Sequence, residues 1–379
     1  MKKVLIVASV ASMIDQFNVP NIELLQSMGY EVHIACNFEK GSTCNSERIQ
    51  KLKKRLLEMG VKYYQIDFSR SVVNMKEHIR AYNQLNILVK KNQYTFMHCH
   101  SPIGGVIGRI VAHQNKVKVI YTAHGFHFFD GAPLKNWLVF YPIEKFFSRW
   151  TDVLITINKE DYTRAKKKLH AKKVEYIPGV GVDIEKFAGN QVGVKKKRQE
   201  LGIDEETIIL LSVGELNANK NHSIVIKALA EMKDEKLHYF IAGKGKLKEE
   251  LLRLAKKLGV EKQVHLLGFR SDIAELMKVA DIYILPSLRE GLNVSLMEAM
   301  ASGLSCIASE IRGNRDLIEN NKNGYLCDAG NVKSYVRVIQ SLANRVEIRK
   351  LYGQSSRKKI KKFDKVQVCN RMRKIYGEL

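Results

Sequence analysis

The chain has 379 residues, 45% of them hydrophobic, and is therefore long enough for two globular domains of ordinary size. Its formal net charge of +24 predicts an anionic partner or surface, because self-repulsion on this scale otherwise only costs stability. No apolar run approaches the roughly 18 residues of a membrane span, so the sequence argues against a helix that crosses a bilayer.

The first half, residues 1–182, predicts a domain of alternating strands and helices. Buried strands, with amphipathic helices between them, are expected at 3–10, 30–36, 61–68, 95–101, 118–123 and 152–157. Residues 1–14 also resemble a short signal peptide, since two lysines precede an apolar run and small residues. We favour a first buried strand, because the same alternation of strand and helix continues without interruption.

A polar and basic stretch, 183–204, predicts the linker to a second domain over 205–355. Strands of this domain are expected at 207–213, 237–242, 263–268, 281–286, 304–308 and 324–327. The tail, 345–379, has the pattern of a helix throughout, and its last part, 356–379, lies beyond the second domain. Two doubly wound α/β domains that face each other would line a cleft with the carboxyl ends of their strands.

Six cysteines are scattered along the chain, with neither a Cys-x-x-Cys pair nor histidines at metal-ligand spacing: Cys36, Cys44, Cys99, Cys306, Cys327 and Cys369. This pattern predicts reduced thiols, as in the cytosol, and argues against a structural zinc site.

The positive charge is clustered at 48–55, 164–173, 195–198 and 357–365. Between the first two clusters, the segment 135–150 mixes both tryptophans and several Phe and Tyr rings with basic residues. Such a segment could dock at an anionic bilayer surface. Core packing of the aromatic rings, with the charges in solvent, explains it equally well, so both interpretations stay open.

The segment PSLREGLNVSLMEAMASG, 286–303, lies between two apolar runs and predicts a strand–loop–helix–strand unit of a parallel sheet. In such a unit the loop 289–293 presents backbone N–H groups and the positive end of a helix dipole to a crevice, which suits a phosphate. Glu290 instead suits hydroxyl donors, as on a sugar, and Glu298 could reach a second polyol such as a ribose. The alternative is that Glu290 is an ordinary charge in a loop and Glu298 an ordinary solvent-exposed residue of the helix.

Neighbouring strand ends of the second half carry related chemistry. Gly214 follows the strand 207–213, and Lys220 lies just before the next helix, where its ammonium would face the same crevice. A lysine at a helix start is nevertheless more often exposed to solvent. Gly243 and Gly245 predict a tight turn after the following strand but do not form a GxGxxG fingerprint. Together these strand ends describe a crevice for a nucleotide diphosphate.

In the first half, His124 follows the strand 118–123 and is well placed to hydrogen-bond a ligand. Three further histidines lie nearby: His98 and His100 in the preceding expected strand, 95–101, and His127 after the strand 118–123. For each of them a ligand role and core packing stay equally open.

Taken together, these residues resemble the donor site of the retaining, nucleotide-sugar-dependent glycosyltransferases of family 4 (group 1), which have the GT-B fold of two Rossmann-like domains. The resemblance covers nearly the whole chain, because further segments occur in the expected order: GYEVHIAC, YTAHGFHFF, YIPGVGVD, SVGELNANKNH and VHLLGFRSDI. More narrowly, the chain is similar to bacterial transferases of capsular and exopolysaccharide biosynthesis. The resemblance implies an acceptor-binding first domain, a donor-binding second domain and a C-terminal helix that packs back on the first.

The resemblance also implies roles for individual residues. Glu290 would contact the donor sugar near the reacting carbon, His124 would reach the transferred sugar, and Glu298 would hold the ribose. The diphosphate and the rest of the donor would contact Lys220, Gly214 and the backbone of Gly291, Leu292, Asn293 and Val294. The chain departs from the pattern at Glu215, where many members have arginine, so that another cation must substitute, with Arg289, Lys244 and Arg312 as candidates.

The activity implied is retaining transfer from a nucleotide sugar, with uridine the expected base, to a lipid-linked or saccharide acceptor, without a metal or another cofactor. The basic charge and the acceptor imply a cytoplasmic protein at the inner face of the membrane, and no nucleic-acid-binding motif is present. A nucleotide-sugar epimerase or phosphorylase is the alternative. It would share the crevice but would not need a basic, aromatic-rich first domain.

Overall fold

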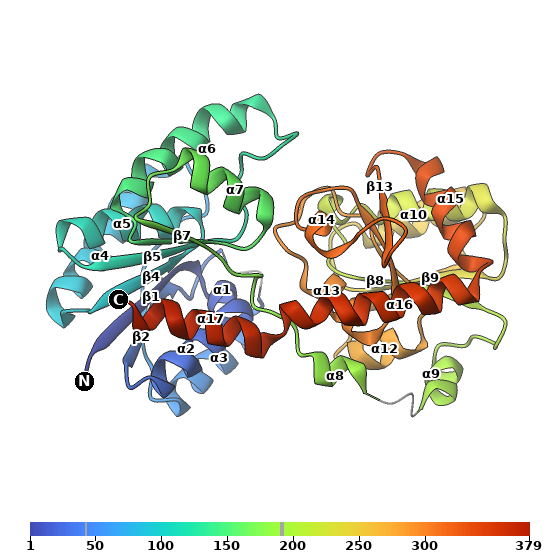
Figure 1. Cartoon of the computed structure of the whole chain (residues 1–379), viewed down its shortest axis with the longest axis horizontal. Coiled ribbons are helices and arrows are strands. Elements are labelled where there is room, and N and C mark those ends of the chain that lie inside the picture. The colour runs from blue at the N-terminus through green and yellow to red at the C-terminus, as the bar shows by residue number, and fades with distance from the viewer. Residues whose placement is uncertain (42–43, 190–192) are drawn as a thin grey trace. The chain divides into compact units, whose positions relative to one another are not determined.

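A computed structural model of the chain describes residues 1–41, 44–189 and 193–379. The chain forms two compact units, residues 1–180 with 368–379 and residues 181–367. Each unit has its own sheet, in which neighbouring strands are parallel, with helices on both faces (Figure 1). The sequence prediction of two doubly wound α/β units is therefore confirmed.

The first unit contains a seven-stranded sheet in the order β3-β2-β1-β4-β5-β6-β7. Its strands are β1 (Lys3–Val10), β2 (Glu31–Asn37), β3 (Lys62–Gln65), β4 (Phe96–His100), β5 (Lys118–Ala123), β6 (Val153–Thr156) and β7 (Lys173–Tyr176). Residues 3–10 thus form a buried strand in the interior of the sheet, between β2 and β4, as the strand interpretation predicts. Strand β7 was not predicted, because this short edge strand is partly exposed and lacks an apolar run.

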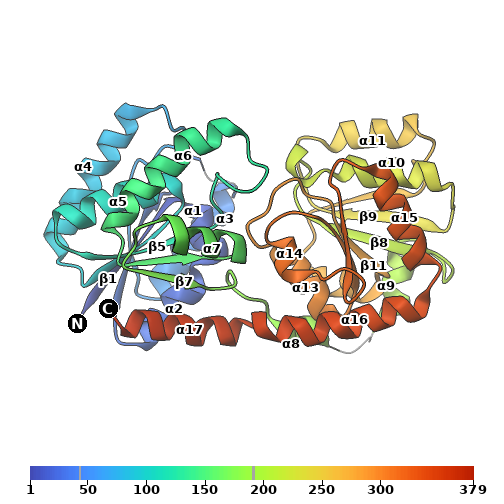
Figure 2. The same cartoon turned by 45° about the horizontal axis from the view of Figure 1, so that its top comes forward.

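The two faces of this sheet bury alternate residues of β1. Val4 and Ile6 pack with α2, α3 and the C-terminal helix, whereas Leu5 and Val7 pack with α4 and α5. Helices α4, α5 and α6 lie side by side on this second face (Figure 2). The helices of the unit are α1 (Ala11–Phe17), α2 (Val19–Ser27), α3 (Ser46–Glu58), α4 (Met75–Asn92), α5 (Pro102–Gln114), α6 (Leu134–Phe147), the 3₁₀ helix η1 (Ser148–Trp150) and α7 (Lys159–Lys168).

The second unit contains a six-stranded sheet in the order β10-β9-β8-β11-β12-β13. All six strands were predicted: β8 (Ile208–Val213), β9 (Leu237–Ala242), β10 (Val264–Gly268), β11 (Ile282–Leu285), β12 (Ser305–Ser309) and β13 (Gly324–Cys327). The four interior strands are buried on both faces and form continuous apolar runs, which made them visible in the sequence. The helices that follow them are η2 (Ala218–Lys220), α10 (His222–Met232), α11 (Lys248–Lys257), α12 (Ile273–Val279), α13 (Val294–Ser302), α14 (Asn314–Leu317), α15 (Val332–Ala343) and α16 (Val346–Ile360).

The stretch 183–204, predicted as a linker, contains two short helices that cluster with the second unit, α8 (Ile184–Ala188) and α9 (Val194–Glu200). Residues 190–192 of this stretch lie outside the described residues. Helix α8 packs on α13, and α9 packs on α12, where Lys197 Nζ lies 2.7 Å from Asp272 Oδ2. Polar contacts rather than an apolar stripe hold α9, so hydrophobic periodicity gave no signal for it.

The C-terminal segment was expected to be helical throughout, but the helix is interrupted after Ile360. The 3₁₀ helix η3 (Lys361–Phe363) and a β-bridge between Val182 and Asp364 separate α16 from α17 (Lys365–Gly377). Gly181 has φ +72°, and a Cβ there would lie 2.8 Å from the Cα of Lys365, so this close approach requires glycine.

Helix α17 carries the chain back to the first unit, as predicted. Its buried side chains join the core that β1 and β2 form with α2 and α3: Val368, Met372, Ile375 and Tyr376. The six cysteines form no disulfide within the described residues. Among the described helices none combines the length and the apolar character needed to cross a membrane.

Candidate active site

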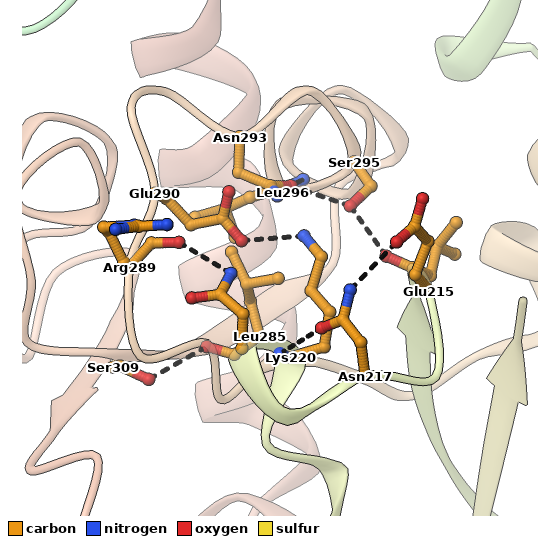
Figure 3. Close-up of polar contacts among 12 residues, drawn as sticks. Glu215, Asn217, Lys220, Leu285, Arg289, Glu290, Asn293, Ser295, Leu296 and Ser309 are labelled. Carbon is orange, nitrogen blue, oxygen red and sulfur yellow. Dashed lines mark hydrogen bonds and ion pairs between the residues drawn. The ribbon is translucent and has the colours of Figure 1, made fainter. Parts of the chain in front are cut away.

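The second unit brings Lys220 and Glu290 together at the carboxyl ends of its central strands (Figure 3). Lys220 ends η2, which follows β8, and Glu290 lies in the loop between β11 and α13. The Lys220 Nζ and Glu290 Oε1 atoms are 2.7 Å apart, and the side chains are only 16% and 14% exposed. A cation suited to a phosphate and a carboxylate suited to hydroxyl groups therefore lie side by side, from positions 70 residues apart in the sequence.

Asparagine side chains fix the two loops that carry this pair. Asn219 donates a hydrogen bond from Nδ2 to the carbonyl oxygen of Arg289 at 2.9 Å. Asn217 caps η2, where its Oδ1 accepts from the backbone N–H of Lys220 at 3.0 Å. The positions of Lys220 and Glu290 are thus set by their loops and do not depend on the ion pair alone.

Helix α13 begins beside this pair with a capped first turn. The Oδ1 atom of Asn293 accepts from the backbone N–H of Leu296 at 3.0 Å and from the hydroxyl of Ser295 at 2.7 Å. Ser295 Oγ also lies 2.6 Å from the Tyr283 hydroxyl of β11 and 3.1 Å from the carbonyl oxygen of Val213 in β8. These contacts anchor the positive end of the α13 dipole to the strand ends, which is the geometry of an anion site.

The loop residues expected to face a donor lie immediately before α13 or in its first turn: Gly291, Leu292, Asn293 and Val294. The side chains of Leu292 and Asn293 are buried, so that their backbone groups are the part available to a ligand. A Cβ on Gly313, which has φ +77°, would lie 2.1 Å from the carbonyl oxygen of Gly291. The loop after β12 therefore packs directly on the loop of Glu290.

Glycines at the ends of β8 and β9 allow the neighbouring turns to touch. A Cβ on Gly243 would lie 1.8 Å from the carbonyl oxygen of Gly214, and a Cβ on Gly214 would lie 3.1 Å from Cε of Lys220. Gly214 thus leaves room for the side chain of Lys220 to reach Glu290. A direct contact of Gly214 with a donor stays a prediction.

Glu298 lies in the middle of α13, and its side chain is half-buried. Burial raises the pKa of its carboxyl to about 7, and the charge of Lys186 on α8 opposes this rise only in part. A carboxyl that titrates near neutrality is a common feature of functional sites, because such sites desolvate their charged groups.

Glu215, where the resemblance implies an arginine, turns its charge toward a neighbouring side chain. Its Oε2 accepts a hydrogen bond from Asn217 Nδ2 at 2.9 Å, and the side chain is exposed (Figure 3). The ammonium of Lys220 therefore pairs with Glu290 and not with Glu215, although Glu215 is nearer in the sequence.

The three cations proposed as substitutes for that arginine have different environments. Lys244 and Arg289 are exposed, whereas Arg312 is 6% exposed. Arg312 donates from Nε to the carbonyl oxygen of Glu290 at 3.3 Å. Of the three, Arg312 is thus the buried cation in contact with the backbone of the Glu290 loop.

In the first unit, His124 directly follows β5 and contacts a second histidine. Its Nε2 lies 3.0 Å from Nδ1 of His100, at the end of β4. Burial lowers the pKa of His124 to about 4, so its ring is neutral at pH 7. By contrast, both ring nitrogens of His98 lie in hydrogen bonds, to Thr122 at 2.8 Å and Tyr376 at 2.9 Å, which is the pattern of a core histidine.

The fourth histidine of this region, His127, stacks on the ring of Phe140 with 4.5 Å between centroids. Within the part of the chain that the structure describes, no group of three or more His, Cys, Asp or Glu side chains is arranged to hold a metal ion.

The side chains that hold the loops of the site in place were not predicted from the sequence. Asn219 and Ser295 link its loops, and Asn221 donates to the carbonyl oxygens of Pro286 at 3.2 Å and Ala329 at 2.9 Å. Three asparagines within the stretch 217–221 were an available signal, because this side chain readily bonds to loop backbone.

Comparison with known families agrees with this geometry. The family described as "Glycosyl transferases group 1" matches residues 193–359, and "Glycosyl transferase 4-like" matches residues 3–158. The first match contains the Lys220–Glu290 pair and α13, and the second contains His124. Both halves of the chain are thus assigned to the same class of enzyme.

Individual proteins match over almost the full length. EpsD of Bacillus subtilis (strain 168), named as a glycosyltransferase, is 36% identical over 383 aligned residues that cover 99% of this chain and 96% of EpsD. The UDP-Gal:alpha-D-GlcNAc-diphosphoundecaprenol alpha-1,3-galactosyltransferase of Escherichia coli is 26% identical, with 97% of this chain and 94% of that enzyme covered.

A solved structure shows the same fold. Anabaena HepE, crystallised with UDP, superposes on this chain with a TM-score of 0.81 and is 18% identical in sequence. The superposition covers 100% of both chains. The chain therefore belongs to the group 1 glycosyltransferases, enzymes that here have the GT-B fold.

Proposed function

We propose that this enzyme transfers a sugar from a UDP-sugar to a saccharide carried on a diphosphate-linked polyprenol, with retention of the anomeric configuration, in the synthesis of a capsular polysaccharide or exopolysaccharide. The name of the E. coli relative specifies both a UDP-sugar donor and a diphosphoundecaprenol-linked acceptor, and HepE has also been crystallised with UDP-glucose. The proposal includes no metal cofactor and no nucleic-acid partner.

The observation that carries the proposal is the 2.7 Å contact between Lys220 and Glu290 beside the start of α13. The ammonium and the helix dipole would both stabilise the charge that grows on a departing diphosphate. The carboxylate would stabilise the positive charge that develops on the anomeric carbon. The two charges needed at the breaking bond are thus adjacent and of the right sign.

Retention follows if the acceptor attacks from the face that the diphosphate leaves. The bond between the anomeric carbon and the diphosphate oxygen breaks while a bond to the acceptor oxygen forms on the same side. The proton of the acceptor hydroxyl passes to the leaving diphosphate oxygen, so no protein base is required. His124, neutral at pH 7, would contribute a hydrogen bond to the transferred sugar.

A panel of nucleotide sugars tests the proposal through thermal stability. A specific UDP-sugar should raise the melting temperature in a concentration-dependent way, because a ligand that binds only the native state stabilises it by mass action. Transfer should then require a diphosphate-linked polyprenyl saccharide. Turnover of the donor without that acceptor would instead favour an epimerase, and turnover dependent on inorganic phosphate would favour a phosphorylase.

Donor affinity should depend on pH through Glu298. The pKa of this carboxyl is raised to about 7, so the folded chain binds a proton more readily than the unfolded chain, and the stability of the free enzyme should fall as pH rises from about 4.5 to 7. Ribose hydroxyls donate best to the ionised carboxylate, so UDP should bind several-fold more tightly at pH 8 than at pH 6.

The matched control for this pH dependence is Glu298→Gln, which removes the titration and keeps the shape of the side chain. Calorimetric titration with UDP at pH 6, 7 and 8 is the measurement, because it reports binding without catalysis. A dependence of equal size in Glu298→Gln would assign it to another group and would contradict the ribose-binding role.

We also propose that the enzyme works as a peripheral protein at the cytoplasmic face of the membrane. The net charge of +24 supports this location, because anionic lipids attract basic surfaces at about 1 kcal/mol per lysine or arginine near the bilayer. Binding to vesicles that contain anionic lipid should therefore weaken as the salt concentration rises.

A further inference from the structure

The first unit contains an apolar cavity of about 470 Å³ on the face of its sheet covered by α4, α5 and α6. One wall is a stripe on α5 with helical spacing: Ile103, Val106, Ile107 and Ile110. The other walls come from the N-terminal end of α4, from α6 and from the loop after β5. Volumes of this size are typical of sites for small molecules, and an apolar lining favours an apolar ligand.

A buried ion pair lies beside the cavity, and its carboxylate partner, Glu144, lines it. Arg109 Nη2 lies 3.0 Å from Glu144 Oε2, and the two side chains are 0% and 8% exposed. The guanidinium also lies 4.2 Å from the ring centroid of Tyr121, whose hydroxyl donates to Glu144 at 3.2 Å. Such a pair is costly to break, because either partner alone would be an uncompensated buried charge, so the pair ties α6 to α5 beside the cavity.

Helix α6 has an unusual distribution of buried and exposed side chains. Glu144 is its one buried residue, whereas four large apolar side chains are exposed by 46–72%: Leu134, Leu138, Val139 and Phe146. Aromatic and apolar residues otherwise occupy most of its surface. Large apolar side chains are rarely left in water on one helix face, so this exposed face calls for an apolar partner.

Apolar exposure is concentrated around the cavity. The exposed Val72, Met75 and Ile79, from α4 and the residues before it, line the cavity itself. With Val73 and the four residues of α6, they account for eight of the eighteen large apolar side chains exposed in the described residues. Exposed apolar side chains gathered on and beside two helices that line one cavity are the pattern of an interaction site.

Helix α6, which lines the cavity, and the following η1 carry charges that complement an anion. The surface of α6 and η1 carries three cations, Lys135, Lys145 and Arg149, while the single acidic residue of this segment, Glu144, is buried in its ion pair. A ligand with an apolar chain and an anionic head therefore matches both features. The lining also includes Gly125, the residue that follows His124, so the cavity opens next to the histidine proposed to reach the transferred sugar.

We propose that this cavity holds the isoprenoid chain of the lipid-linked acceptor, at the end nearest the diphosphate. The proposal rests on the proposed function and adds a named site for the part of the acceptor that does not react. A concave cavity lined by aliphatic and aromatic side chains can select a chain of defined shape, whereas contact with a bilayer needs only the exposed face of α6. Binding energy from the chain would then position the sugar to be extended near His124.

Farnesyl diphosphate is the probe, because it is soluble without detergent and combines three isoprene units with a diphosphate. Both tryptophans of the chain are in this region, and the Trp137 ring lies 5.7 Å from that of Phe128, which lines the cavity. Farnesyl diphosphate should therefore change the intrinsic tryptophan fluorescence in a saturable way. Inorganic diphosphate at the same concentration should not.

Two variants test the location of the site. Val106→Phe adds volume to the α5 wall and should weaken farnesyl diphosphate binding by about tenfold or more, because a filled cavity cannot take the chain. Ile79→Asp changes a side chain that is 58% exposed at the cavity, so it should fold normally and weaken binding through its charge and polarity. Unchanged affinity in both variants would overturn the proposal.

Leu138→Ser is the matched control, because Leu138 is 69% exposed on α6 but does not line the cavity. It should leave farnesyl diphosphate binding unchanged and weaken binding to vesicles that contain anionic lipid. If vesicles bind and farnesyl diphosphate does not, the cavity is part of a bilayer contact and the proposal is wrong. The donor titration keeps the two hypotheses apart, since a UDP-sugar should stabilise the enzyme whether or not the cavity takes a prenyl chain.

Discussion

Replacement of Glu290 by glutamine is expected to lower the rate of sugar transfer by about 10²–10³-fold while the enzyme stays folded and continues to bind its donor. Glutamine keeps the size of the side chain and can still accept a hydrogen bond from Lys220, 2.7 Å away. It removes the negative charge that would stabilise the anomeric carbon as the diphosphate departs. The loss should therefore appear in kcat, because this charge matters most in the transition state.

The measurement is single-turnover transfer at saturating donor, together with the melting temperature and the UDP affinity of the variant. Glu215→Gln is the matched control. This carboxylate lies between β8 and α10, as Lys220 does, but it accepts a hydrogen bond from Asn217 and is exposed. The control variant should transfer at nearly the wild-type rate. Full activity in Glu290→Gln, or an equal loss in Glu215→Gln, would remove the catalytic role from Glu290.

The sequence was most informative about the parts of the fold that are buried on both sides. Strands such as β1 and β11 are continuous apolar runs, so their positions could be predicted to within a few residues. The edge strand β7 and helix α9 could not, because one is partly exposed and the other is held by the contact of Lys197 with Asp272. Hydrophobic patterning reports burial and therefore misses elements that polar contacts hold in place.

The candidate site was predictable in its components but not in its contacts. Strand-end chemistry and the family resemblance indicated Glu290, Glu298 and Lys220, yet no local rule places an ammonium against a carboxylate 70 residues away. The raised pKa of Glu298 follows from burial on α13, against which α8 packs from a stretch expected to be a linker. The contact of Arg312 with the Glu290 loop likewise depends on how the loop after β12 packs, which the sequence does not specify.

Replacement of Lys220 by alanine is expected to weaken donor binding by about 10–100-fold, the range for loss of a hydrogen bond to a charged group. Lys220 is 16% exposed and lies beside the capped start of α13, so its ammonium would meet the diphosphate in a poorly screened environment. Calorimetric titration with UDP is the measurement. Lys244→Ala is the matched control, because Lys244 is exposed in the loop after β9 and should contribute little.

The effect of Lys220→Ala should be larger than the loss of one favourable contact. The Glu290 side chain is only 14% exposed beside Lys220, and the substitution removes the cation that pairs with its carboxylate. An unpaired carboxylate beside a diphosphate repels it, so the double variant Lys220→Ala with Glu290→Gln should bind UDP more tightly than Lys220→Ala alone. UDP lacks the sugar, so this gain cannot come from contacts of Glu290 with sugar hydroxyls. Equal UDP affinities in the single and double variants would mean that Glu290 does not lie beside the diphosphate, and the proposed division of charge across the breaking bond would be wrong.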